Sequence, residues 1–595
     1  VMIQKNNPVI PIVDSSKFSK NQRPKSALKG RQADEVSLKE VRLLIPESQY
    51  RRDLLIENLH VINDFYKGLR DTHLVALAKL MNIAMAEVYE VASFYHHFEI
   101  LRDDASAPTT TIRVCNSVSC ELAGSHALHQ ELTKFFTDPK VRIVNVPCIG
   151  RCEQAPAAYI NQYPVAQASV SLIKQNFIEH CSSHPQASST ANFNPCDFLE
   201  KSIPSNPQII APEYCGYQTY TEKAGYELLK KIVAHLITPE QAIKVMADSG
   251  LRGLGGAGFL AGKKWQIVKD FSGSKNLAVN IDEGEPGTFK DRTYLERDPH
   301  RFLEGMFIAA HVVNIDTCYI YLRDEYHGCR AILEKEIALL TANPPCQLPR
   351  IELRRGAGAY ICGEESAMIE SIEGKRGEPR LRPPYIAQVG LFGLPTLEHN
   401  FETLYWVRDI LERGPEWFSS FGRNGRKGLR SFSVSGRVCN PGVKLAPAGI
   451  TVQELIDEYC GGMLPGHHLY AYLPGGASGG ILPATMNQIP LDFDTLQKYG
   501  CFIGSAAVII LGHQDRARDS ALNVMRFFEH ESCGQCTPCR VGTAKAAQLM
   551  SHAQWDHNTL KDLSQVMADA SICGLGQAAP NPIRCVQQFF PHEVS

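Results

Sequence analysis

The stretch NLAVNIDEGEPGTFKDR, residues 276–292, decides the fold because it joins an apolar strand to a loop crowded with polar and acidic side chains. Four such residues stand at or after the end of the strand: Asn280, Asp282, Glu283 and Glu285. Further apolar strands, such as 318–321, alternate with helical segments, which is typical of an α/β domain. Ligands of α/β sheets bind where strands end, so this loop is a candidate site; solvated loop carboxylates are the alternative.

A glycine-rich loop, GLRGLGGAGF at residues 250–259, lies before this strand. Gly253, Gly255 and Gly258 have the Gly-x-Gly-x-x-Gly spacing, which lets backbone amides approach a phosphate. A dinucleotide fingerprint normally follows a strand, whereas residues 239–249 have a helical pattern, so an ordinary Rossmann fold is not expected. Taken alone, the loop is explained equally well as a packing turn.

A third segment, RRGAGAYICGEESAMIESIEGKRGEPRLRPP at residues 354–384, places Glu364 and Glu365 after a glycine-rich turn and at the start of a predicted helix. Carboxylates at a helix start repel phosphate but accept hydrogen bonds from hydroxyl or amide groups. We therefore predict that this segment contacts a ribose, a nicotinamide or a flavin ring.

Eight of the 19 cysteines fall into two groups. In the first group, Cys115 and Cys120 enclose four residues, Cys148 and Cys152 enclose three, and each pair follows a predicted strand. This spacing favours a [2Fe-2S] cluster, with a structural zinc ion as the alternative.

The second group is Cys533, Cys536 and Cys539 in ESCGQCTPCR, followed by Cys573. Three thiols with two residues in each gap fit a [4Fe-4S] cluster better than a tetrahedral zinc ion. Cys585 receives no role, and the single cysteines such as Cys501 are predicted to pack in the core.

Composition places limits on the class of protein. A chain of 595 residues predicts several domains, and 44% hydrophobic with 21% charged residues is ordinary for a globular protein. With 61 basic and 63 acidic residues and no long apolar run, we expect neither nucleic acid nor a membrane as a partner. The chain start lacks a secretory pattern, so we expect a cytoplasmic protein, whose clustered thiols then indicate metal ligation.

These motifs carry a resemblance to a known family. Residues 226–595 resemble the NADH-oxidising flavoprotein subunit of respiratory complex I through GLRGLGGAGF, NIDEGEPGTFKDR, GAYICGEES, PRLRPPY and ESCGQCTPCR. Residues 36 to about 180 resemble its thioredoxin-like [2Fe-2S] partner, including AEVYEVASFYHHF and the first cysteine group. Both units in one chain resemble the flavin-bearing diaphorase subunit of soluble NAD-reducing [NiFe] hydrogenases.

The resemblance implies site residues. The implied FMN contacts are Gly253, Gly255, Gly256, Gly258, Lys264, Asn280, Asp282, Glu285, Tyr360, Gly363, Glu364 and Asn400. The implied NADH contacts are Phe259, Glu365, Arg382 and Tyr385, of which Glu365 and Phe259 are taken as the catalytic pair. Three positions depart from the family pattern: His399 before Asn400 leaves one FMN contact in question, Ile267 replaces a common aromatic residue, and Arg382 replaces a lysine.

The expected fold is α/β multidomain. It comprises a flexible arm (1–35), a helical bundle (36–108), a thioredoxin-like [2Fe-2S] domain (109–180), a linker (181–225), an α/β FMN/NAD domain (226–430), a β-grasp domain (431–513) and a helical [4Fe-4S] domain (514–595). The bundle is expected from helical repeats such as Leu55, Leu59, Ile62 and Phe65.

The resemblance implies a reversible NAD(H):FMN diaphorase with FMN, NAD, a [2Fe-2S] and a [4Fe-4S] cluster as cofactors. Its implied partners are an iron–sulfur diaphorase subunit and [NiFe] hydrogenase subunits in a hetero-oligomer. Two alternatives stay open: an NADH-oxidising subunit of complex I or of an NAD-dependent formate dehydrogenase, and, more remotely, a zinc-stabilised nucleotide-binding scaffold.

Overall fold

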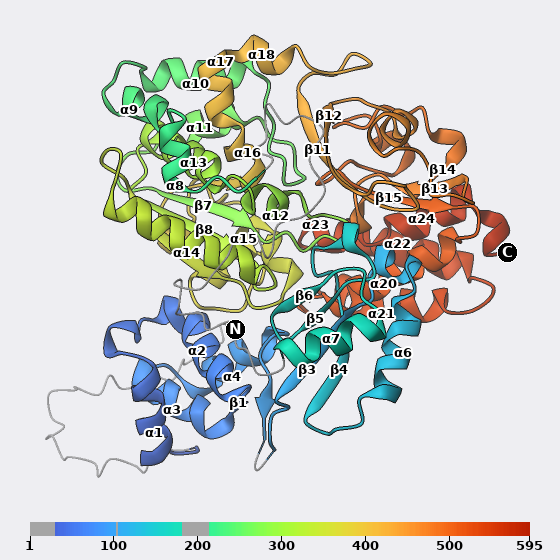
Figure 1. The fold of residues 1–595 in the computed structure, drawn as a ribbon, viewed down its shortest axis with the longest axis horizontal. Helices are drawn as coiled ribbons and strands as arrows, with labels where there is room; N and C mark the ends of the chain where they lie inside the picture. The colour runs from blue at the N-terminus through green and yellow to red at the C-terminus, as the bar shows by residue number, and fades with distance from the viewer. Residues whose placement is uncertain (1–29, 103–104, 181–212) are drawn as a thin grey trace, which may run out of the picture.

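The computed structural model describes residues 30–102, 105–180 and 213–595 (Figure 1). Most of the expected arm and of the expected linker lie outside these residues. The last part of the expected linker, however, forms helix α8 (Tyr217–Glu222). The cause is apolar packing, because Tyr220 is buried and donates a hydrogen bond to Glu304 at 2.5 Å.

The first described unit is the expected helical bundle. Its helices are α1 (Glu35–Leu44), α2 (Leu55–Tyr66), α3 (Asp71–Met81) and α4 (Met85–Phe94), with the short strands β1 (Leu69–Arg70) and β2 (Ile100–Leu101). Leu55, Leu59 and Ile62 are buried as their spacing predicts, whereas Phe65 is 63% exposed. The two-residue strands pair in parallel and close the bundle.

The second unit contains a four-stranded sheet in the order β4-β3-β5-β6. Strand β3 (Thr110–Cys115) pairs in parallel with β4 (Val141–Val146), and antiparallel with β5 (Ala158–Ile160), which continues into β6 (Tyr163–Val165). Helices α5 (Val118–Leu122), α6 (Ser125–Phe135) and α7 (Val170–His180) accompany the sheet. This is the α/β arrangement that the alternating sequence pattern predicts.

The third unit is built on a parallel sheet in the order β10-β7-β8-β9. Its strands are β7 (Asn276–Ile281), β8 (Thr317–Leu322), β9 (Arg350–Arg355) and β10 (Thr396–Asn400). The helices are α9 (Glu227–Val233), α10 (Pro239–Asp248), α11 (Ala261–Lys269), α12 (Lys290–Leu295), α13 (Pro299–Val313), α14 (His327–Ala342), α15 (Glu365–Ile372), α16 (Phe401–Tyr405), α17 (Val407–Arg413) and α18 (Pro415–Ser419). Because β10 follows β7 in register, Asn400 lies opposite Asn280 at the carboxyl edge of the sheet.

The fourth unit is a five-stranded mixed sheet in the order β12-β11-β15-β13-β14, as expected of a β-grasp. Its strands are β11 (Leu429–Gly436), β12 (Gly442–Pro447), β13 (Leu469–Leu473), β14 (Leu482–Pro483) and β15 (Ala507–Gly512), and α19 (Val452–Glu454) begins the helical crossing between the hairpins. The C-terminal unit is helical: α20 (Ala517–His530), α21 (Thr537–Met550), α22 (His557–Ala570), α23 (Gly574–Ala578) and α24 (Asn581–Phe589).

Polar and apolar contacts join the N-terminal units to the rest of the chain. In the bundle, His60 donates a hydrogen bond to the carbonyl of Gly356 at 2.8 Å, and Tyr95 donates one to the carbonyl of Lys375 at 2.8 Å. Helix α5 lies beside the β-grasp sheet and α20, where Ser119 meets Ser435 at 2.8 Å. The units therefore form one continuous body in which buried side chains connect segments far apart in the sequence.

Replacing the buried Arg292 with methionine is expected to destabilise the contact between the second and third units by about 3–5 kcal/mol. Arg292 is fully buried, donates to the carbonyl of Gly150 at 2.9 Å and pairs with Glu296 at 2.9 Å and with Glu153. The variant leaves two carboxylates buried without this partner. A drop in the unfolding temperature measures the effect, and the matched control Arg350→Met, from an exposed pair with Glu352, should change it little.

Candidate cofactor sites

The first cysteine group converges on one point between two strand ends. Cys115 ends β3, Cys120 lies in α5, and Cys148 and Cys152 follow β4; all four are buried. The sulfur atoms of Cys148 and Cys152 are 3.3 Å apart, and Cys115 lies within hydrogen-bonding reach of Cys120 and Cys148. Four converging thiols fit a [2Fe-2S] cluster.

The polypeptide around these cysteines supplies donors as well as ligands. The amide of Gly150 points at the sulfur of Cys148 at 3.4 Å. Arg323 donates to the carbonyl of Cys148 at 2.8 Å and thereby brings a buried positive charge from the α/β unit close to the thiol group. Such outer contacts orient the ligands and offset the negative charge of a thiolate-bound cluster.

The second cysteine group lies at the starts of two helices. Cys536 is the N-cap of α21 and Cys573 is the N-cap of α23. Electrostatic interactions link Cys539 to both Cys536 and Cys573, and Cys533 to Cys573, so the four thiols face one another. Four neighbouring thiols at the starts of two helices fit the predicted [4Fe-4S] cluster.

Cys585 and Cys501 differ from the isolated packing predicted for them. Both are buried, and their sulfur atoms lie 3.5 Å apart, between α24 and the β-grasp unit. They lie apart in sequence from both cysteine groups, and no spacing rule connects residues 501 and 585.

The glycine-rich loop lies between α10 and α11, as the helical pattern before it predicts. A bridge between Arg252 and Leu260 closes the loop, and the amide of Gly253 donates to the carbonyl of Phe259 at 2.8 Å. Gly256 and Gly258 adopt positive φ angles of 134° and 67°. A Cβ atom on Gly255 would lie 3.0 Å from Cβ of Asn400, so only glycine leaves this loop open toward the sheet edge.

The sheet edge and the segment before α15 meet the loop. Asn280 donates to the carbonyl of Gly363 at 2.8 Å, and Asn400 donates to Asp291 at 2.7 Å. The hydroxyl of Tyr360 donates to Glu285, which also accepts from the amide and hydroxyl of Ser478 at 2.7 Å. The structure therefore brings the three sequence segments and the β-grasp unit to one place.

The buried carboxyl group of Asp282 has an oxygen atom that is available to a ligand. Its Oδ2 atom is buried and has no hydrogen-bond partner among the described residues. Gly363 leaves space beside it, because a Cβ atom on Gly363 would lie 3.9 Å from this Oδ2 atom and 3.3 Å from the carbonyl oxygen of Asp282. A polar ring edge, as in a flavin, would satisfy this orphaned carboxyl oxygen, so the residues present fit FMN.

The predicted nucleotide contacts lie on the outer side of this site. Phe259 and Tyr385 are 46% and 55% exposed, so their rings are accessible for stacking. Arg382 pairs with Glu364 and, at 3.1 Å, with Glu365. Lys264 donates to Glu398 at 2.7 Å, and its charge acts on Glu365.

Two predicted contacts have structural roles that the sequence did not reveal. Glu364 caps α15 by accepting from the amides of Ser366 and Ala367, each at 3.0 Å. His399 is buried and accepts a hydrogen bond from Trp265 at 2.8 Å, which fixes its imidazole in the core. Glutamate is not among the residues preferred at an N-cap, so the sequence carries no capping signal at Glu364.

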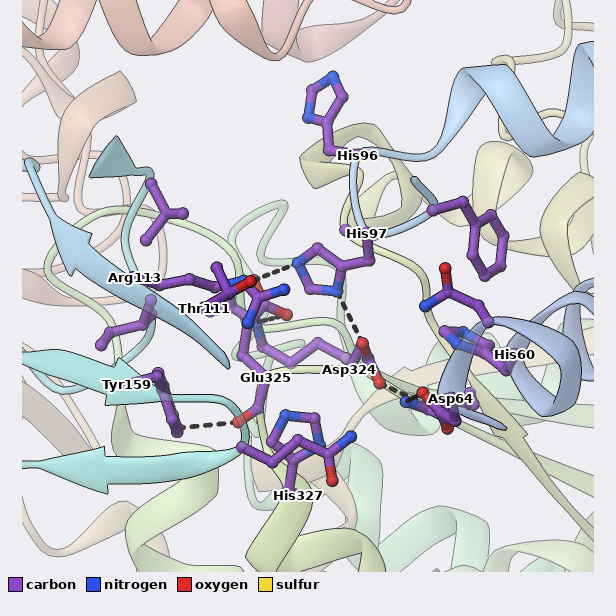
Figure 2. Close-up of a pocket in the computed structure, with 18 of the residues that line it drawn as sticks. His60, Asp64, His96, His97, Thr111, Arg113, Tyr159, Asp324, Glu325 and His327 are labelled. Atoms are coloured by element: carbon purple, nitrogen blue, oxygen red, sulfur yellow. Dashed lines mark hydrogen bonds and ion pairs between the residues drawn. The ribbon is translucent and has the colours of Figure 1, made fainter. Parts of the chain in front are cut away.

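A cavity of about 1240 Å³ adjoins two of the predicted FMN contacts. Its walls include Cys148, Asp282 and Tyr360, and Figure 2 shows the pair of His97 and Asp324, which also line it. The Nδ1 atom of His97 lies 2.7 Å from Asp324. Sequence reasoning missed this cavity because at least seven stretches of the chain, far apart in sequence, line it.

Comparison with known proteins assigns the family. Residues 41–179 match the family described as thioredoxin-like [2Fe-2S] ferredoxin, 246–409 match the Nuo51 FMN-binding domain, and 519–595 match the NADH-ubiquinone oxidoreductase-F iron–sulfur binding region. An NADH-quinone oxidoreductase subunit of Rhizobium meliloti (strain 1021) is 38% identical over 390 residues, which cover 63% of this chain and 92% of that protein. The chain belongs to the family of NADH-quinone oxidoreductase flavoproteins.

Other members of this family extend the comparison. NADH dehydrogenase [ubiquinone] flavoprotein 1 of Dictyostelium discoideum is 40% identical over 59% of this chain and 78% of that protein. A solved structure of NAD+-reducing [NiFe]-hydrogenase in the H2-reduced state is 32% identical, covers 92% of each chain and has a TM-score of 0.78. The resemblance inferred from the motifs is therefore confirmed, as are the FMN-binding and iron–sulfur domains and the assignment to NAD-dependent oxidoreductases.

No helix in the described ranges is long and apolar enough to cross a bilayer. The iron–sulfur families that match both cysteine groups argue against the zinc-stabilised scaffold. Relatives in complex I and in a hydrogenase further support a place in a hetero-oligomer.

Raising the pH from about 4 to about 8 is expected to destabilise the flavin-free protein more than its Asp282→Asn variant. Burial raises the pKa of Asp282 from 3.8 to about 8. Between these values the unfolded chain releases a proton that the folded chain retains, so the contribution of Asp282 to stability is full below pH 4 and falls by roughly 1 kcal/mol per pH unit up to about pH 8. Unfolding temperatures at pH 5 and 8 measure the difference between the two proteins. Equal losses would show that Asp282 is ionised throughout.

Proposed function

We propose that this chain is the NAD(H):FMN diaphorase subunit of a cytoplasmic NAD-reducing hydrogenase, with an iron–sulfur diaphorase subunit and [NiFe] hydrogenase subunits as partners. One observation carries the proposal: the hydrogenase chain aligns over 92% of both proteins, whereas the Rhizobium protein aligns with 63% of this chain. A single polypeptide that unites the thioredoxin-like and flavin units supports the hydrogenase arrangement over a complex I subunit.

Different residues would position different parts of FMN and NAD(H). Bound FMN supplies the conversion between hydride chemistry and single-electron exchange with iron–sulfur clusters. The glycine loop leaves room for its phosphate beside Asn400, and Asn280 and Asp282 offer polar atoms to the ring edge. Phe259 and Tyr385 offer exposed ring faces to NAD(H). No side-chain nucleophile is required.

Glu365 is proposed to orient the nicotinamide end of NAD(H). Burial raises the pKa of its carboxyl, while Arg382 lies 3.1 Å away. Replacing Glu365 with alanine is expected to reduce kcat/KM for NADH-dependent dye reduction by roughly tenfold or more, which corresponds to about 1.4 kcal/mol of lost transition-state stabilisation. The matched control is Glu412→Ala, which removes an exposed carboxylate elsewhere on this unit. Unchanged dye reduction in the Glu365 variant would remove this residue from the site.

Purification of the native complex through this chain tests the proposed function. Hydrogen-driven reduction of NAD+ under anaerobic conditions, together with nickel, iron and flavin in the preparation, is the expected result. NADH-to-dye activity without nickel or hydrogen oxidation would overturn the hydrogenase assignment. Co-purification of formate dehydrogenase subunits or of membrane subunits would then show which kind of complex contains this chain.

A further inference from the structure

Three side chains form a cluster where the N-terminal bundle meets the C-terminal unit. His96 follows α4, His530 is the last residue of α20, and Glu531 caps that helix. Their nearest ligand-type atoms all lie within 4.8 Å of one another. Neither cysteine group uses these residues, and the flavin and nucleotide contacts do not include them.

The geometry points to a binding site for a divalent transition-metal cation, of which Zn²⁺ is the representative, held by His96, His530 and Glu531. Two imidazoles and one carboxylate are a ligand set that zinc accepts, with water at the fourth position. The three side chains offer two imidazole nitrogens and one carboxylate oxygen to a single ion.

The distances between the ligand atoms suit a common metal. Oε1 of Glu531 lies 3.0 Å from Nδ1 of His530 and 3.7 Å from Nδ1 of His96. Ligands that sit 2.0–2.1 Å from a tetrahedral zinc ion are separated by roughly 3.3 Å. The two histidine rings meet edge to face with centroids 4.2 Å apart, so they lie next to each other beside the carboxylate.

A backbone hydrogen bond holds the carboxylate of Glu531 in place. The second oxygen of Glu531 accepts the amide of Tyr360 at 2.9 Å, and the Glu531 side chain is only 6% exposed. An outer hydrogen bond of this kind fixes the orientation of a metal-binding carboxylate. The two imidazoles are 40% and 47% exposed, which gives an ion access from solvent.

The surroundings supply the remaining coordination position. His96, His530 and Glu531 all line the cavity of about 1240 Å³, which provides room for a metal-bound water. Figure 2 shows that His96 and His97 point in opposite directions, with His97 turned to Asp324 and His96 turned away from it. His97 is therefore engaged elsewhere, and His96 is available for the cluster.

A bound cation would connect three parts of the molecule. The turn after α4 belongs to the bundle, Tyr360 belongs to the proposed flavin site, and Glu531 precedes Cys533 of the second cysteine group by two residues. One ion would thus tie the bundle to the segment between flavin and cluster. Binding to the folded state alone would also raise the unfolding temperature as the cation concentration increases.

Zinc binding to the chelator-washed holoprotein tests the site. Equilibrium dialysis with Zn²⁺ should give one saturable ion per chain, and His96→Ala and His530→Ala should each weaken its binding by at least about tenfold. The matched control His552→Ala, an exposed histidine outside the cluster, should bind as the wild-type protein does.

A second measurement needs no variant. Zinc K-edge absorption of the wild-type holoprotein should show nitrogen and oxygen neighbours that include imidazole, with iron and flavin content unchanged. A sulfur shell would mean that zinc occupies the cysteine groups, and would overturn the site. Absence of a saturable ion, or equal affinity in both cluster variants and the control, would overturn it too.

Discussion

Replacing Cys536 with alanine is expected to slow electron exchange between the bound flavin and a protein partner by at least about 100-fold, equivalent to about 2.7 kcal/mol. Cys536 caps α21 and faces Cys539 and Cys573, so the variant removes one of four thiolates from the proposed [4Fe-4S] site. NADH-dependent reduction of a small dye takes place at the flavin and should be retained to a large extent. Hydrogen-driven NAD+ reduction by the complex and iron content per chain are the measurements.

The matched control for this variant is Cys439→Ala. Cys439 is exposed and lies in the loop after β11, outside both cysteine groups. This control should retain its iron content and both activities. If Cys536→Ala lost dye reduction in parallel with hydrogen-driven activity, the cluster would be required to hold the flavin unit together, and its proposed role as the electron exit would fail.

The strand ends and cysteine pairs could be predicted because they depend on local sequence. An apolar run followed by a polar loop is a strand in a parallel sheet, and β7 spans Asn276–Ile281 as the pattern indicates. Cys115 and Cys148 each follow a predicted strand, and parallel pairing of β3 with β4 brings the two strand ends together. Strand pairing therefore brings two cysteine pairs that are separated in sequence into one site.

Contacts between distant segments could not be predicted in the same way. The cavity, the pair of Cys501 and Cys585 and the cluster of His96 with Glu531 each join segments that no spacing rule connects. Strand β12 and the two-residue strand β14 were also missed, because each lies at an edge of its sheet and pairs with one neighbouring strand. Tertiary packing, rather than local pattern, determines these features.

Substituting valine for Gly255 is expected to leave the protein without bound flavin and therefore to abolish both NADH-dependent dye reduction and hydrogen-driven activity. The added Cβ would lie 3.0 Å from Cβ and 3.5 Å from Cγ of Asn400, so a branched side chain must displace Asn400 or fill the space at the sheet edge. Asn400 cannot move freely, because it caps α16 and donates to Asp291 at 2.7 Å. The added side chain therefore occupies the place proposed for the flavin phosphate.

Flavin content per chain, measured after release from the purified protein, separates this effect from general unfolding. Iron content should stay near that of the wild type, because both cysteine groups lie on other elements. Ala257→Val is the matched control, since Ala257 is exposed in the same loop and already carries a Cβ. A Gly255→Val protein that retained its full flavin content would show that the loop does not border the phosphate. In that case Asp282 and Asn280 would have to bind the cofactor from the opposite side of the sheet edge.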